Sequence, residues 1–106
     1  MTRNLKIDKL RIKIDRLNHD LLSLINKRAE LAVQIGKIKK SEGLPISDPK
    51  REALIIQGMA DENPGPLDEK AVTGLFSLLI RETKRIEREH SLEPLAQTGK
   101  TDKRNA

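Results

Sequence analysis

The first third of the chain carries an apolar stripe whose positions recur at alternating intervals of four and three residues. The stripe consists of Leu10, Ile14, Leu17, Leu21, Leu24, Arg28, Leu31, Ile35 and Ile38. This period is typical of a helix whose single apolar face meets a partner helix. One member, Arg28, is a cation that cannot lose its proton, and burying it without an anion is strongly unfavourable. We therefore expect an anion at the same depth, and its identity is the main clue to function.

The distribution of apolar residues, prolines and glycines predicts three helices. No proline interrupts residues 5–40, and lysines and arginines gather near the C-terminal end of this segment, where the helix dipole favours them. Asp48 followed by a proline predicts the start of a second helix over residues 49–60, because Asp is a good N-cap and Pro fits the first helical position. A third helix is predicted over residues 67–90, where apolar residues again recur at helical spacing.

The first predicted helix is too long for a domain of this size. It would span roughly 54 Å, whereas a compact domain of this length has a diameter of roughly 33 Å. The apolar stripe of the protruding part must be buried, and a second copy related by a two-fold axis is the simplest partner. We therefore expect an all-α, three-helix protomer over residues 1–90 that forms a homodimer, followed by a polar, disordered tail over residues 91–106.

The composition argues against several classes of function. The chain has no cysteine, and its histidines, His19 and His90, lack a zinc-binding spacing, so no metal is expected. No apolar run is long enough to cross a membrane and the start lacks a signal peptide, so we expect a cytoplasmic protein without a membrane partner. The net charge of +5 comes from 21 basic residues interleaved with 16 acidic ones, and Phe76 is the single aromatic residue. Base stacking is therefore not available, and no nucleic-acid partner is expected.

Several charged or polar residues occupy positions on predicted buried faces. Arg28 and Lys39 are separated by three helical turns and lie within about 20° of the same face, so their side chains could close on a small anion. Arg11 is about 100° around the helix from Arg28 and roughly 25 Å away, so it could join them only from the partner of an antiparallel dimer. In the third helix, Thr83 and Glu87 continue the apolar face.

The first turn of the second helix adds three further candidates. Asp48 fits the N-cap, Arg51 could pair with a carboxylate, and Glu52 lies in the same turn. Each of the candidate charges also has a purely structural interpretation. Arg28 could be a register device, a buried polar residue that fixes the alignment of two packed helices, and the others could be a helix cap or solvated surface charges. The residues taken one at a time leave both interpretations open.

Three short motifs follow one another along the predicted helices. They are L-R-x-x-I-D from Leu10, R-x-E-L-A-x-x-I-G-x-x-K from Arg28 to Lys39, and P-I-x-D-P-x-R-E from Pro45 to Glu52. Together they resemble the all-helical chorismate mutase family over residues 5 to about 90. The resemblance implies an intertwined homodimeric helical bundle of three-helix protomers, with two equivalent sites that convert chorismate to prephenate.

The resemblance also implies a site without metal or cofactor. The substrate is a small dicarboxylate, and the one-step pericyclic rearrangement requires only positioning and stabilisation of negative charge on the ether oxygen. By resemblance, Arg28 and the partner's Arg11 would bind the carboxylates, and Lys39 would donate to the ether oxygen. Thr83 would add a carboxylate contact.

For the ring of the substrate, the resemblance implies that Glu52 and the Asp48 backbone bind the ring hydroxyl. It also implies that Arg51 orders this cluster. Glu87 stands where the family often has a glutamine that donates to the ether oxygen. A carboxyl group can donate only when it is protonated, so this role requires burial and the substrate's charge to raise the pKa of Glu87. Nearby Lys84, which replaces an apolar residue typical of the family, would oppose that shift.

The expected function is thus a chorismate mutase in phenylalanine and tyrosine biosynthesis. An isochorismate pyruvate-lyase is the alternative enzyme, because the same cations would serve a nearly identical dianion, although the motif that ends at Glu52 favours the mutase. A dimeric helical interaction module without catalysis is the alternative from another class.

Overall fold

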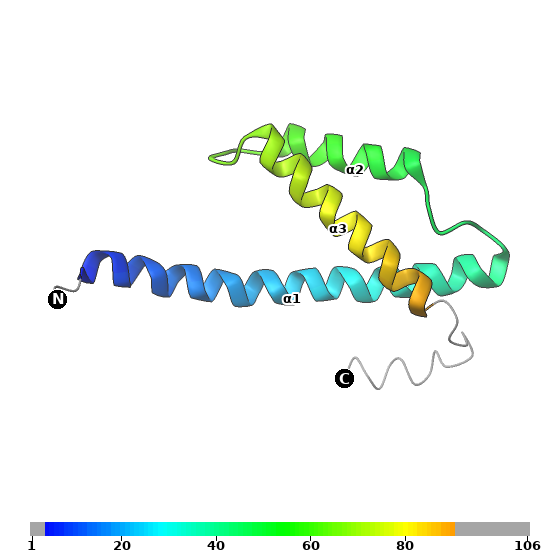
Figure 1. Cartoon of the computed structure of the whole chain (residues 1–106), viewed down its shortest axis with the longest axis horizontal. Helices are drawn as coiled ribbons and strands as arrows, with labels where there is room; N and C mark the ends of the chain where they lie inside the picture. The colour runs from blue at the N-terminus through cyan, green and yellow to red at the C-terminus, as the bar shows by residue number, and fades with distance from the viewer. Residues whose placement is uncertain (1–3, 91–106) are drawn as a thin grey trace. The chain divides into compact units, whose positions relative to one another are not determined.

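The structure, a computed structural model, describes residues 4–90. Its helices are α1 (Leu5–Glu42), α2 (Pro49–Glu62) and α3 (Glu69–His90) (Figure 1). The prediction of an all-α protomer with three helices is confirmed for this part of the chain. The predicted disordered tail, residues 91–106, lies outside the described residues.

The end of α1 is set by a glycine. Gly43 has a φ of 72°, in the left-handed region that glycine adopts without a steric penalty. The N–H of Leu44 donates to the carbonyl oxygen of Lys39 at 2.8 Å, the bond that characterises a Schellman motif. This cap ends α1 at Glu42, slightly beyond the predicted end, and turns the chain into the loop that leads to α2.

The start of α2 follows the prediction. Asp48 is the N-cap, its side chain accepts the N–H of Arg51 at 3.1 Å, and Pro49 begins the helix. The helix continues to Glu62, past the predicted end at residue 60. The capped first turn holds the loop before α2 in a defined position.

The start of α3 lies two residues later than predicted because an aspartate caps it. The side chain of Asp68 accepts the N–H of Ala71 at 2.8 Å, so the first helical residue is Glu69 rather than Leu67. The helix reaches His90, as predicted.

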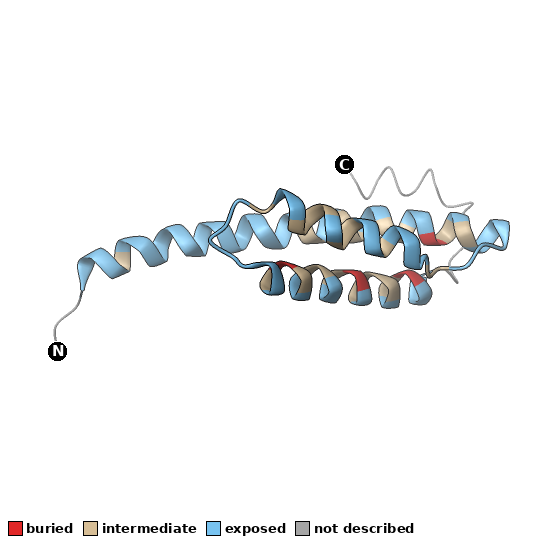
Figure 2. Ribbon diagram, turned by 90° about the horizontal axis from the view of Figure 1, so that it is seen from above, coloured by how far each residue is buried: buried red, intermediate tan, exposed pale blue. Residues whose placement is uncertain are grey.

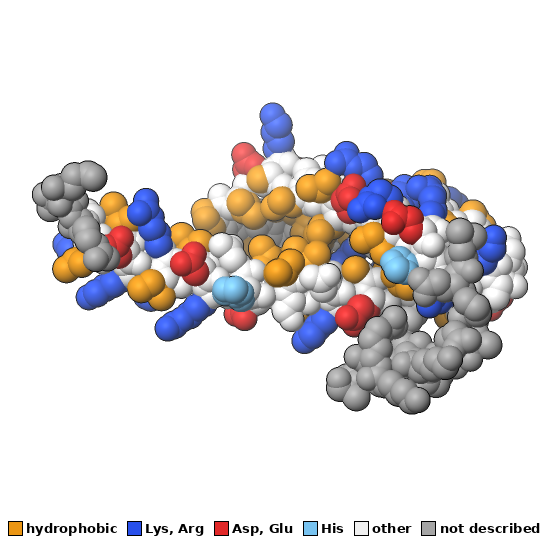
Figure 3. Space-filling view, turned by 60° about the horizontal axis from the view of Figure 1, so that its bottom comes forward, with side chains coloured by type: hydrophobic (Ala, Val, Ile, Leu, Met, Phe, Trp, Pro, Cys, Tyr) orange, Lys and Arg blue, Asp and Glu red, His pale blue; other side chains and the backbone are white. Residues whose placement is uncertain are grey.

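The chain divides into two compact units, Met1–Leu31 and Ala32–Ala106. In the first unit the described residues from Leu5 onward form the N-terminal part of α1, and its apolar stripe is exposed (Figure 2). Its members in the N-terminal half of the helix, which are 53 to 64% exposed, are Leu10, Ile14, Leu17 and Leu21. Figure 3 shows such apolar side chains at the surface among charged ones. A lone helix has no second layer against which to bury a stripe, so this surface is uncovered in a single chain.

In the second unit, α2 and α3 pack against each other as a helical hairpin (Figure 1). The buried residues of α3 are Val72, Ile80 and Glu87, which lie about two turns apart on one face. Thr83 on the same face is half-buried. The predicted inward face of α3, which ends in a hydroxyl and a carboxyl group, is therefore present in the structure.

The C-terminal part of α1 meets α3 at Gly36. A Cβ atom built at Gly36 would lie 3.1 Å from the Cβ and 3.3 Å from the Cγ of Glu87, closer than ordinary contacts between side chains. Gly36 is accordingly the buried residue of α1. The absence of a side chain at this position lets α3 bring Glu87 against α1.

Candidate active site

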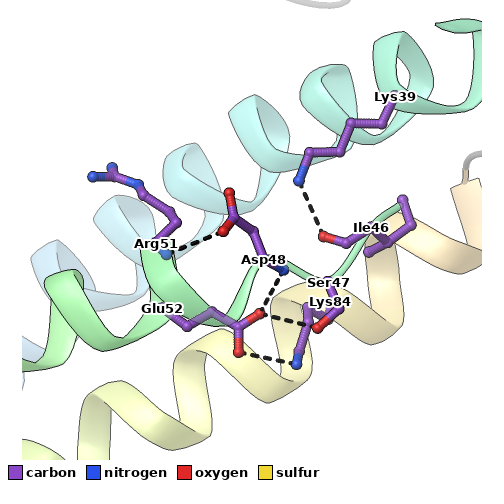
Figure 4. A network of polar contacts seen from close by, with 7 residues as sticks. All are labelled: Lys39, Ile46, Ser47, Asp48, Arg51, Glu52 and Lys84. Carbon is purple, nitrogen blue, oxygen red and sulfur yellow. Dashed lines mark hydrogen bonds and ion pairs between the residues drawn. The ribbon is translucent and has the colours of Figure 1, made fainter. Parts of the chain in front are cut away.

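The loop between α1 and α2 holds a network of polar contacts to which all three helices contribute (Figure 4). Its members are Lys39, Ile46, Ser47, Asp48, Arg51, Glu52 and Lys84. All of them belong to the second unit. The network joins residues that lie far apart in the sequence around one short stretch of backbone.

Lys39 contributes from the last turn of α1. It is half-buried, and its Nζ donates to the carbonyl oxygen of Ile46 at 3.0 Å. It is therefore folded over the loop rather than extended into solvent. An ammonium group has three donors, so Lys39 can hold the loop and still donate to a bound ligand.

Glu52 is the anionic centre of the network. Its Oε2 accepts the N–H of Asp48 at 3.2 Å and the hydroxyl of Ser47 at 3.4 Å. Its Oε1 accepts from the Nζ of Lys84 at 3.1 Å, which ties the first turn of α2 to α3. The Glu52 and Lys84 side chains are 23% and 24% exposed, so this ion pair is largely shielded from water.

The surroundings of Glu52 favour its ionised form. Burial acts to raise its pKa, but the hydrogen bonds from Lys84, Asp48 and Ser47, with the positive charge of Lys84, lower the pKa below its ordinary value. The carboxylate is therefore negatively charged at neutral pH.

The ion pair leads to a pH-dependent stability. The pKa of Glu52 is lower in the folded chain than the ordinary value of 4.5. The ion pair therefore contributes to the free energy of unfolding above pH 4.5, and this contribution is lost as the pH falls through the folded-state pKa. We expect Lys84→Met to lower the temperature of thermal unfolding at about pH 7 and to have a smaller effect at about pH 3. Arg85→Met, which removes an exposed cation paired with Glu82 and Glu89, is the control and should have the smaller effect. An effect of Lys84→Met that is the same at both pH values would contradict this account.

Arg51 enters the network through its backbone. Its N–H donates to Asp48, whereas its exposed side chain points away from Glu52 (Figure 4). The family resemblance implied that Arg51 would order the cluster. In the structure the cation that pairs with Glu52 is Lys84.

Lys84 is the charged member of the network that the sequence did not single out as a site residue. A signal was present, because Lys84 follows Ile80 by four residues and precedes Glu87 by three, which places it near the buried face of α3. A lysine at such a position needs an acidic partner. The sequence could not identify that partner, because Glu52 lies on another helix.

Glu87 and Thr83 lie on the face of α3 that meets the rest of the second unit. Glu87 is 8% exposed and is the buried charged residue among those described. It packs against Gly36, one helical turn before Lys39 on α1. Thr83 is half-buried one turn earlier on α3. The fold thus brings Lys39, Glu87 and the Glu52 network into the same unit.

The two predicted arginines belong to the first unit. Arg28 is half-buried and Arg11 is exposed, and both lie on the continuous helix α1. The helical rise separates them by roughly 25 Å along one chain. They are therefore not brought together within a protomer, and their part in the site remains a prediction.

The described residues contain no group of three or more His, Cys, Asp and Glu side chains arranged to hold a metal ion. Nor is any helix of residues 4–90 both long and apolar enough to span a bilayer.

Comparison with known proteins gives consistent matches. The family model described as chorismate mutase type II matches residues 10–88. The chorismate mutase of Methanocaldococcus jannaschii is 33% identical over 88 residues, which cover 80% of this chain and 87% of that protein. The 4-amino-4-deoxychorismate mutase of Streptomyces venezuelae is 31% identical over 91 residues, which cover 82% of this chain and 85% of that protein. The solved structure of chorismate mutase from Helicobacter pylori in complex with prephenate has a TM-score of 0.79 and 27% identity, covering 86% of this chain and 99% of that one.

Proposed function

Because the chain belongs to the type II chorismate mutase family, its reaction is the conversion of chorismate to prephenate, and we propose that the residues described above catalyse it. The observation that carries the proposal is the position of Lys39, Glu52 and Glu87 within one helical unit. The reaction is an isomerisation in which an ether C–O bond breaks as a C–C bond forms, so the protein need supply only position and electrostatic stabilisation. We place it in the biosynthesis of phenylalanine and tyrosine, in the cytoplasm.

The carboxylate end of the substrate is assigned to cations. Arg28 and the partner's Arg11 bind the two carboxylates, for which the planar guanidinium fork is well suited. Thr83 adds a hydroxyl donor from α3. For the two arginines the proposal rests on the sequence motifs and the family.

The ether oxygen and the ring hydroxyl are assigned to residues of the second unit. Lys39 donates to the ether oxygen, where negative charge develops as the C–O bond breaks. The ring hydroxyl donates to the ionised Glu52 carboxylate, which the N–H of Asp48 holds in place. Arg51 stands beside this cluster through its backbone contact with Asp48.

Glu87 is proposed as a second donor to the ether oxygen, a role that requires its carboxyl group to be protonated. We expect kcat/KM of the wild-type protein to fall as pH rises and Glu87 ionises. The amide of Glu87→Gln donates at every pH, so the kcat/KM of this variant should not fall as the pH rises. The measurement is kcat/KM for chorismate against pH for both proteins. If the two profiles coincide, Glu87 has no part in the mechanism.

A homodimer completes the proposal. The apolar stripe of α1 is exposed in the single chain, and its period suits packing against another helix. A second copy related by a two-fold axis would cover the stripe and supply Arg11. Each protomer would then depend on the other for a complete site.

An absorbance assay for chorismate loss, with identification of the product, tests the function directly. Prephenate is the expected product. The alternative enzyme, an isochorismate pyruvate-lyase, would instead release pyruvate and salicylate from isochorismate, so both substrates are offered separately. Loss of neither substrate would favour a non-catalytic helical module.

A further inference from the structure

The ion pair between Lys84 and Glu52 places a positive charge beside the carboxylate that is assigned to the ring substituent of the substrate. The Nζ of Lys84 lies 3.1 Å from Oε1 of Glu52, and both side chains are about three-quarters shielded from water. The other cations of the network are engaged elsewhere, since Lys39 donates to Ile46 and the Arg51 side chain points away (Figure 4). The charge of Glu52 is therefore balanced before any substrate binds.

The hydrogen bonds that Glu52 accepts leave it limited capacity for another donor. An ionised carboxylate offers about four acceptor positions. Ser47, the Asp48 N–H and Lys84 occupy three of them. One position remains, which matches the single O–H donor of a hydroxyl group.

A protonated amine would meet a different environment at the same place. An aliphatic amine carries a positive charge at neutral pH and has three donors. It would find one acceptor position, with its charge close to the ammonium of Lys84. Repulsion between two positive charges in a site shielded from water strongly disfavours binding of the amine.

We infer that Lys84 is a specificity-determining residue, which makes the site favour a hydroxyl over a protonated amine at the ring position that Glu52 binds. The inference rests on the proposed function, in which Glu52 accepts the ring hydroxyl. It extends that function by assigning the selection against amino-substituted substrates to an ion pair between α2 and α3. The amino compound that tests it is 4-amino-4-deoxychorismate, which carries an amine in place of the hydroxyl.

The experiment measures kcat/KM for chorismate and for 4-amino-4-deoxychorismate with the wild-type protein, Lys84→Met and Lys84→Gln. Both variants remove the positive charge and keep an unbranched side chain. We expect the wild-type protein to prefer chorismate and the ratio of the two kcat/KM values to fall at least about tenfold in both variants. Arg85→Met is the matched control, because it removes a neighbouring exposed cation of α3, and its ratio should equal that of the wild-type protein.

The outcomes separate this inference from the proposed function. A ratio within about twofold of the wild-type value in both charge-removing variants, with chorismate still converted, overturns the inference alone. Because the readout is a ratio, a general loss of activity through reduced stability does not imitate the expected result. If one variant does not fold, as judged by helical circular dichroism, the other decides. If the wild-type protein converts neither compound, the proposed function fails and the inference fails with it.

Discussion

Replacement of Arg28 with alanine is expected to reduce kcat/KM for chorismate by about 10²–10³-fold or more. Arg28 is half-buried on α1, within a stripe that is otherwise apolar. In the proposed function its guanidinium binds a carboxylate and holds the substrate in the reactive conformation, so alanine removes both attraction and orientation. The measurement is steady-state kinetics, with size-exclusion chromatography to establish that the oligomeric state is unchanged.

A neighbouring cation provides the control for this variant. Lys27 is adjacent on α1 and exposed, so Lys27→Ala changes the net charge equally without touching the proposed site. Its kcat/KM should stay close to the wild-type value. Arg28→Leu extends the test, because leucine would repair the apolar stripe. If Arg28 served only as a register device, this variant would be as active as the wild type and at least as stable.

Mixing two inactive variants is expected to restore activity. Arg11→Ala retains Arg28, and Arg28→Ala retains Arg11, so each homodimer lacks one arginine in both sites. A mixed dimer has one site with both arginines and one site with neither. Random pairing makes half of the dimers mixed, so the mixture should recover roughly a quarter of wild-type activity.

The mixture is prepared by co-expression, or by unfolding the two variants together and refolding them. Each variant treated alone in the same way is the control and should remain inactive. An affinity tag on one of the two variants, followed by native mass spectrometry, shows whether mixed dimers have formed. If exchange occurs and the two variants together stay inactive, Arg11 does not act across the dimer, and the shared site is wrong.

The helices could be predicted closely because their signals are local. The end of α1 depends on Gly43, and the start of α2 depends on Asp48 and Pro49, all of which act within one helical turn. The error at the start of α3 has the same origin. Asp68 caps the helix, so that it begins at Glu69, two residues beyond the predicted start, and the prediction did not use this cap.

The candidate site was predictable only in part. The sequence marked Lys39, Asp48, Glu52 and Glu87 as candidate site residues, and the fold brings them into one unit. It assigned the ordering of the Glu52 cluster to Arg51, which is one residue away. The structure assigns the ion pair to Lys84, which is 32 residues away in sequence.

By itself, the sequence determined the three helices, their apolar faces and the charges that interrupt those faces, since helical periodicity and capping act over a few neighbouring residues. The tertiary structure alone decided which charges meet. The pair of Lys84 with Glu52 and the contact of Glu87 with Gly36 each join two helices. Such contacts depend on how closely and at what angle helices pack, which no local pattern specifies. Packing therefore decided that Glu52 is the partner of Lys84 and that a glycine is needed opposite Glu87.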